Sequence, residues 1–85
     1  MRYIVIFQQI VGSVWQVAYS WDGEKFEDRK VAISHGLKTR GSDDFNIGVL
    51  KNGRLAQFCW MDEVLDFPLA EIADQIGIKA IREGA

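Results

Sequence analysis

Four residues have side chains from which a nucleophile, a base and an orienting group could be assembled: His35, Asp43, Asp44 and Cys59. A cysteine hydrolase would need Cys59 beside His35, with a carboxylate to orient the imidazole. The pattern around Cys59 instead predicts the interior of a strand, not the sharp turn or helix N-terminus that lowers a thiol pKa. We therefore interpret Cys59 as a small, half-buried apolar residue, and we expect no catalytic residue and no enzyme.

The same side chains supply donor atoms for a metal ion. His35 with Asp43 or Asp44 has suitable nitrogen and oxygen ligands, but the sequence lacks paired-ligand spacing and a second His or Cys nearby. We predict no metal site. The sequence also has no cofactor-binding motif, so we predict no cofactor.

Size and composition place the chain among ordinary globular domains. Its 85 residues make one domain, with residues 77–85 as a short tail, and 48% hydrophobic with 26% charged residues argue against a disordered chain. A net charge of -2 is too small to imply a partner, and a dedicated nucleic-acid binder is more often basic. The single cysteine rules out an internal disulfide. With no signal-peptide pattern and no run of membrane-spanning length, we expect a cytoplasmic location, in a bacterium or an infected host cell.

The clearest local structure runs from Phe45 to Met61. Asn52-Gly53 lies between two apolar runs, and both residues tolerate the positive φ of a type I′ turn, which predicts a tight hairpin. Counting outward from this turn puts three pairs on one face, namely Phe45 with Trp60, Ile47 with Phe58, and Val49 with Ala56. The opposite face receives Asn46 with Cys59, Gly48 with Gln57, and Leu50 with Leu55. We predict that the first face is core.

A second hairpin is expected at the start of the chain. Arg2 to Ile10 is rich in β-branched and aromatic residues, and Gly12-Ser13 fits a II′ turn. The resulting register pairs Ile4 with Trp21, Ile6 with Tyr19, Gln8 with Val17, and Ile10 with Trp15. These four nearly apolar pairs share one face, and the three tryptophans are expected in the core.

Two helices are predicted from capping signals and apolar spacing. Asp28 is a suitable N-cap and Gly36 a suitable residue just past the helix end, although the alternation around Val31 and Ile33 leaves a strand over 28–36 open. Pro68 suits the first position of the second helix. Its buried stripe follows helical spacing and precedes a stop at Gly77; the stripe is Leu69, Ile72, Ala73 and Ile76.

The resulting order is β-β-α-β-β-α. It predicts an α+β domain with a four-stranded, mainly antiparallel sheet and both helices packed on one face. The opposite face would then expose an apolar patch, and large exposed patches usually mark interfaces. We expect a homodimer through this patch, which consists of Val5, Phe7, Ala18, Leu50 and Leu55.

Three charged or polar groups are candidate contact surfaces. An acidic flank, free of Lys and Arg, could occupy a basic groove on a target: Asp62, Glu63, Asp66, Glu71 and Asp74. A loop with Arg40, Asp43 and Asp44 could also hold a partner. A basic rim could neutralise single-stranded nucleic acid: Lys38, Arg40, Lys51 and Arg54. For each group the competing interpretation is ordinary solvated surface or loop chemistry.

Several short tracts resemble small uncharacterised proteins of phages and prophages, over about half of the chain. The tracts are Trp15-Gln16-Val17, Ala32-Ile33-Ser34-His35-Gly36, the run from Ser42 to Gly48, Gly53-Arg54-Leu55, and Trp60-Met61. The resemblance implies a setting and no catalytic residue, because small accessory proteins of mobile elements often bind and block host machinery, including defence complexes.

Together these observations favour a small non-enzymatic protein of a phage or mobile element. We expect it to bind and inhibit a host protein complex, for example as an anti-CRISPR-type inhibitor, through the acidic flank and then the loop. The alternative is a small nucleic-acid-binding module that uses the basic rim. No membrane contact is expected.

Overall fold

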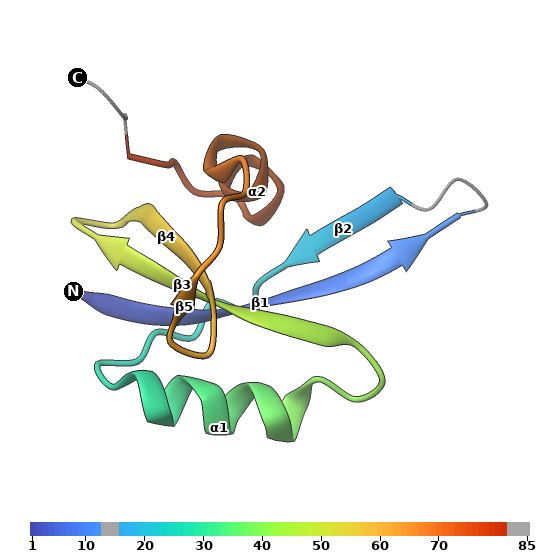
Figure 1. The fold of residues 1–85 in the computed structure, drawn as a ribbon, viewed down its shortest axis with the longest axis horizontal. Coiled ribbons are helices and arrows are strands. Elements are labelled where there is room, and N and C mark those ends of the chain that lie inside the picture. Colours follow the sequence, from blue (N-terminus) through green and yellow to red (C-terminus); the bar gives the residue numbers. More distant parts are fainter. Residues whose placement is uncertain (13–15, 82–85) are drawn as a thin grey trace.

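The computed structural model describes residues 1–12 and 16–81 (Figure 1). These residues form an α+β domain, as predicted, with the following elements in chain order: β1 (Arg2–Val11), β2 (Gln16–Ser20), α1 (Arg29–Thr39), β3 (Asp44–Lys51), β4 (Arg54–Trp60), β5 (Glu63–Val64) and α2 (Leu69–Ile76).

The strands form one sheet in the order β2-β1-β3-β4-β5, and each neighbouring pair is antiparallel. The sheet has five described strands where the sequence predicts four. The additional strand, β5, is only two residues long and pairs back on the end of β4, so it carries no alternating pattern by which to recognise it. Because β2 and β3 are both antiparallel to β1, they run parallel to each other, and α1 is the crossover between them.

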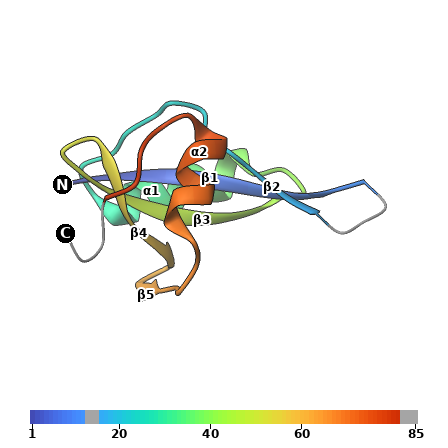
Figure 2. The ribbon, with the colours of Figure 1, turned by 90° about the horizontal axis from the view of Figure 1, so that it is seen from above.

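The prediction that both helices cover one face is wrong: α1 and α2 lie on opposite faces of the sheet (Figures 1 and 2). In β1, Ile4 and Ile6 join the cluster under α2, whereas Val5 joins the cluster under α1. The central strands carry buried residues on both sides, so each face requires its own cover.

This arrangement removes the exposed patch predicted as a dimer face. Val5 and Leu55 are fully buried and Leu50 is 3% exposed, while Phe7 and Ala18 are half-buried. The five residues do not even share a face, because Val5 packs under α1 and the two leucines pack under α2. The error follows from placing both helices on one side.

The central hairpin turns where the sequence predicts. Asn52 and Gly53 have φ of 52° and 76°, as a type I′ turn requires, and Lys51 pairs with Arg54. Leu50 also pairs with Leu55 as predicted.

Beyond these two pairs the predicted register of the central hairpin is wrong. A β-bulge at Ala56 shifts the pairing, so that Val49 faces Gln57, Gly48 faces Phe58, and Ile47 faces Cys59. Phe58 therefore lies under α2 and Ile47 under α1, instead of forming one core face. Trp60 contacts the ring of Phe45, with centroids 5.6 Å apart, but is 40% exposed.

The first hairpin has a longer connection than predicted. Gln8 pairs with Tyr19 and Ile10 with Val17, a register two residues away from the prediction. The shift is even, so each side chain keeps its predicted face. The expected partner Trp15 and the second residue of the expected turn, Ser13, lie outside the described residues.

The two helices confirm part of their predicted boundaries. The side chain of Asp28 caps α1 by accepting from the Lys30 N–H at 2.8 Å, so residues 29–39 are helical and the strand alternative is wrong. Gly36 lies inside α1 and does not end it. Pro68 is the N-cap of α2 and not its first residue, so the helix begins one residue later than predicted, at Leu69. Gly77 ends α2 with φ 83°.

The segment after α2 folds back on the sheet. The Leu55 N–H donates to the Lys79 carbonyl at 2.8 Å, and the Ile81 N–H donates to the Leu55 carbonyl at 3.0 Å. These bonds fix the end of the described chain beside the start of β4.

Candidate partner-binding groove

A groove of about 670 Å³ lies between the first turns of α1 and the turn that joins β4 to β5. Three apolar or aromatic side chains, Tyr3, Ile33 and Met61, line it. Five charged residues complete its wall: Glu27, Asp28, Arg29, Lys30 and Asp62. The groove therefore combines an apolar surface with a charged rim.

Backbone pairing holds one wall of the groove against β1. The Tyr3 N–H donates to the Phe26 carbonyl at 2.7 Å, and the Phe26 N–H donates to the Tyr3 carbonyl at 2.8 Å. This bridge places Glu27 and Asp28 near Tyr3, and the Asp28 cap then starts α1 with Arg29 in the groove lining. The position of this wall is set by the sheet.

The opposite wall is the β4–β5 turn, in which Met61 has a φ of 54°. A left-handed backbone is unfavourable for a residue with a long side chain, and such strain concentrates at functional sites. The Trp60–Glu63 pair closes the turn across Met61 and Asp62. Met61 is thus held at the groove despite an unfavourable local conformation.

Arg29 connects the groove with the core beneath it. Its guanidinium lies over the Tyr3 ring, 5.4 Å from the centroid, and its Nε is buried with no hydrogen-bond partner among the described residues. Burial raises the pKa of the Cys59 thiol, and the nearby positive charge of Arg29 only partly opposes this. Cys59 is fully buried and neutral at neutral pH, which is unsuitable for a nucleophile.

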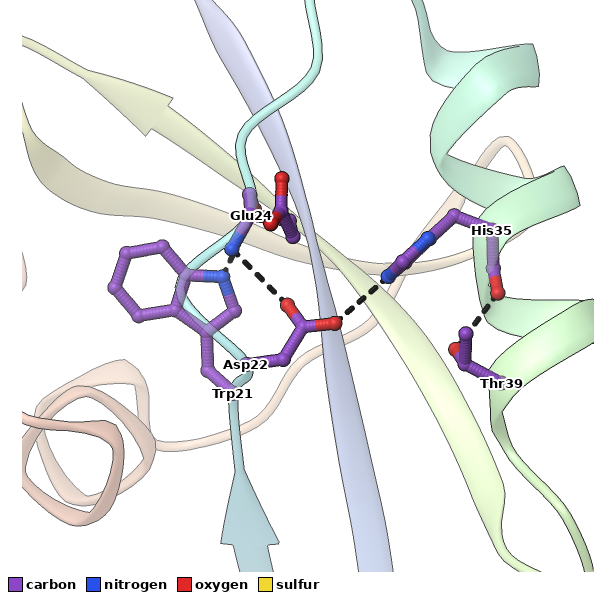
Figure 3. Close-up of polar contacts among 5 residues, drawn as sticks. All are labelled: Trp21, Asp22, Glu24, His35 and Thr39. Carbon is purple, nitrogen blue, oxygen red and sulfur yellow. Dashed lines mark hydrogen bonds and ion pairs between the residues drawn. The ribbon is translucent and has the colours of Figure 1, made fainter.

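A second polar cluster joins the β2–α1 connection to the middle of α1 (Figure 3). His35 Nε2 and Asp22 Oδ2 lie 2.7 Å apart, and Asp22 Oδ1 accepts from the Glu24 N–H at 3.0 Å. The Trp21 Nε1–H donates to the Glu24 carbonyl at 3.0 Å. Partial burial alone would raise the pKa of Asp22, but the bonds from His35 and Glu24 outweigh it, so the pKa lies below its usual value.

This carboxylate–imidazole pair has no nucleophile among its described contacts. The Thr39 hydroxyl donates to the His35 carbonyl at 2.7 Å, and the His35 ring packs on Phe26 with centroids 4.9 Å apart. The pair fastens the connection to α1. It does not assemble the set of His35, Asp43 and Asp44 considered from the sequence.

The loop residues predicted to hold a partner have local roles. The Asp43 carboxylate accepts from Gln9 Nε2 at 2.9 Å, and the Arg40 guanidinium lies 5.8 Å from the centroid of the Phe45 ring. Asp44 is exposed at the start of β3. Two of the three side chains thus connect the loop to the sheet.

The predicted basic rim is divided between the two ends of β3. Lys38 and Arg40 precede the start of this strand, and Lys51 and Arg54 flank the turn at its far end. Seven steps of about 3.3 Å separate the strand ends by roughly 23 Å. The four cations therefore do not form one rim.

The acidic flank is exposed at all five positions but is also divided. Asp62 lines the groove beside α1. Glu71 lies near Tyr19 on the α2 face, where burial and, secondly, the Glu71 charge raise the pKa of Tyr19. Only the first part of the flank belongs to the groove.

The groove also contains residues that sequence reasoning missed, chiefly Tyr3, Glu27, Ile33 and Met61. They come from three distant segments. A strained turn residue gives no signal in the sequence, and Tyr3 and Ile33 look like core residues.

Within residues 1–12 and 16–81, no three His, Cys, Asp or Glu side chains are grouped to hold a metal ion. Neither described helix has the length and apolar character needed to cross a membrane. Comparisons with family models, curated proteins and solved structures found no match. Inferences about function therefore rest on the groove and on the sheet.

Proposed function

We propose that the protein is a non-enzymatic binding module whose groove receives a segment of a partner protein. One observation supports this most: Met61 and Asp62, in a strained turn, line the same groove as Tyr3 and the first turns of α1. The partner segment carries a basic side chain next to an apolar one.

The charges along the groove favour a cation. Three carboxylates face two cations, and the Arg29 guanidinium already stacks on Tyr3. Asp28 serves as the helix cap, and Glu27 lies 4.0 Å from Arg2. Asp62, the charged groove residue of the β4–β5 wall, has no ionic partner among the described residues, and Lys30 on the α1 wall has none either. A Lys or Arg of the partner can lay its methylene groups on the apolar surface and place its charge beside Asp62.

The placement of Cys59 and His35 favours a binding role, because each is held in a structural contact. Cys59 is buried and its pKa is raised, and His35 is fastened to Asp22. Affinity would come from a few anchors, with Met61 and Tyr3 as the apolar ones.

A peptide titration followed by amide NMR tests the proposal. The probe is an acetylated Leu-Arg-Leu-Lys amide, and the matched control is Leu-Glu-Leu-Glu. We expect saturable shifts at Tyr3, Ile33 and Met61 with the basic peptide only. Equal shifts with both peptides, or shifts spread over the whole chain, would contradict the proposal.

Two charge reversals sharpen the test. Asp62→Lys should weaken binding of the basic peptide about tenfold, as expected for the loss of roughly 1.4 kcal/mol. Asp74→Lys changes the net charge equally, but at an exposed position of α2 outside the groove, and should leave the affinity unchanged. An equal loss of affinity in both variants would indicate non-specific electrostatic attraction of the peptide and no defined site.

The phage or mobile-element setting, and inhibition of a host complex, stay predictions. Capture from host lysate with the wild-type protein and with Asp62→Lys as bait bears on them. A host component retained only by the wild-type protein would support binding of that component through the groove.

A further inference from the structure

The two edges of the sheet differ in how they are protected against pairing with another strand. The β5 edge is two residues long, contains Glu63 and follows Asp62. Short length and charge are common ways to block edge pairing. The β2 edge, Gln16–Ser20, has five residues with neither a charged residue nor a proline.

The direction of the free backbone groups of β2 follows from one hydrogen bond. The Tyr19 N–H donates to Gln75 Oε1 of α2 at 2.9 Å, so it points away from β1. Alternate residues of a strand point the same way, and the N–H and carbonyl of Val17 therefore also point outward. Among the described residues they have no partner. Gln75 closes the edge at Tyr19 and leaves it open around Val17.

Apolar side chains accompany this open edge. Ile10 and Val17 pair across β1 and β2 and are 61% and 41% exposed. Helix α2 reaches β2 at Tyr19 and goes no further, and β3 pairs with β1 only as far as Gln8 (Figures 1 and 2). The outer end of the β1–β2 ribbon thus projects with an uncovered apolar pair.

We propose that this edge binds a second copy of the chain, with β2 pairing antiparallel to β2 around a two-fold axis at Val17. Val17 then exchanges two backbone hydrogen bonds with Val17 of the second copy, and Gln16 faces Ala18. The side chains form a continuous row of four, Ile10 and Val17 from each copy, at strand spacings of about 4.8 Å.

A second copy suits this edge because β2 is neutral throughout. Two-fold pairing places identical strands against each other, so any charge in β2 would meet a like charge. The row of four apolar side chains forms when the partner strand presents an apolar residue opposite Val17 with an apolar neighbour beside it, as β2 with Ile10 does. The proposed dimer uses none of the groove residues.

Sedimentation velocity from micromolar to millimolar concentration tests the dimer. We expect the wild-type mass to rise from 9.7 kDa toward twice that value. Val17→Lys should keep the chain monomeric throughout. The matched control, Val31→Lys, changes another exposed valine, 51% exposed on α1, and should dimerise like the wild type.

Hydrogen exchange provides a readout that needs no substitution. The Val17 amide should exchange rapidly in dilute protein and become protected as concentration rises, whereas Val31 should show no such dependence. A wild-type chain that stays monomeric at millimolar concentration would overturn the proposal. So would a dimer that survives Val17→Lys. Asp62→Lys should leave the dimer intact, so failure of the groove and failure of the edge are separable.

Discussion

Gly36 of α1 lies directly against the ring of Phe45, and a Cβ on Gly36 would come within 2.6 Å of the ring atoms Cδ2 and Cε2. Phe45 is 1% exposed, and its ring is further held by the edge contact with Trp60. The glycine therefore sets how closely α1 approaches the sheet. It is required by packing and not by its backbone conformation, because it lies inside the helix.

Gly36→Ala should destabilise the protein although alanine is the better helix former. The propensity gain is about 1 kcal/mol, but the overlap with Phe45 forces a shift of packed elements, and we expect a net loss of about 1–3 kcal/mol. Chemical denaturation measures the change. Ser34→Ala, an exposed position of the same helix, should be neutral or slightly stabilising. A Gly36→Ala variant as stable as the wild type would contradict the close contact.

Met61→Gly should stabilise the fold and weaken the groove. Removing the side chain at φ 54° relieves roughly 1 kcal/mol of left-handed strain. The same change removes an apolar surface of the groove. Met61→Ala loses that surface but keeps the strain, so it separates the two effects. For Met61→Gly, the thermal unfolding temperature should therefore rise while the affinity for the basic peptide falls. A drop in stability would show that the Met61 side chain contributes more than the strain costs.

The Asp22–His35 contact should make stability depend on pH in the acid range. The pKa of Asp22 lies below its usual 3.8 in the folded state, so its ionised form stabilises the fold above that value. This contribution is lost as pH falls through the lowered pKa. The Asp22 side chain is 36% exposed, and after screening we expect less than about 1 kcal/mol. The free energies of unfolding of the wild type and of Asp22→Asn should differ at pH 6 and converge at the lowest pH that keeps both folded. If the difference in unfolding free energy grew as the pH fell, the pH dependence could not be assigned to Asp22.

Cys59 should be unreactive in the folded protein. Its thiol is fully buried and its pKa is raised, so little thiolate is present at neutral pH. A thiol reagent such as dithiobis-nitrobenzoate should react only after denaturant is added. Rapid native reaction would mean that the thiol is accessible and would reopen a nucleophilic role. Cys59→Ser, which places a hydroxyl among apolar neighbours, should lower stability without affecting peptide binding.

The sequence by itself determined the features that depend on a few neighbouring residues. The turn at Asn52-Gly53, the Asp28 cap and the left-handed end at Gly77 are all present, because backbone dihedrals and capping bonds are intrinsic to these residues. The α+β class followed from the order of these elements. The candidate site was predicted only through Asp62, one acid of the flank.

The tertiary structure alone decided which face each helix covers and which residues meet in the groove. The run Ile4–Ile6 is apolar on both sides, a pattern that fits a strand buried between two helices but does not exclude one exposed face. Phe45–Leu50 is apolar on one side and has Asn46 and Gly48 on the other, yet it is buried throughout. The bulge at Ala56 reverses the faces beyond it, and nothing local to that residue predicts it. Glycine commonly ends helices, yet Gly36 lies inside α1, where it packs against Phe45 of β3. Such choices depend on long-range packing, which short-range propensities do not contain.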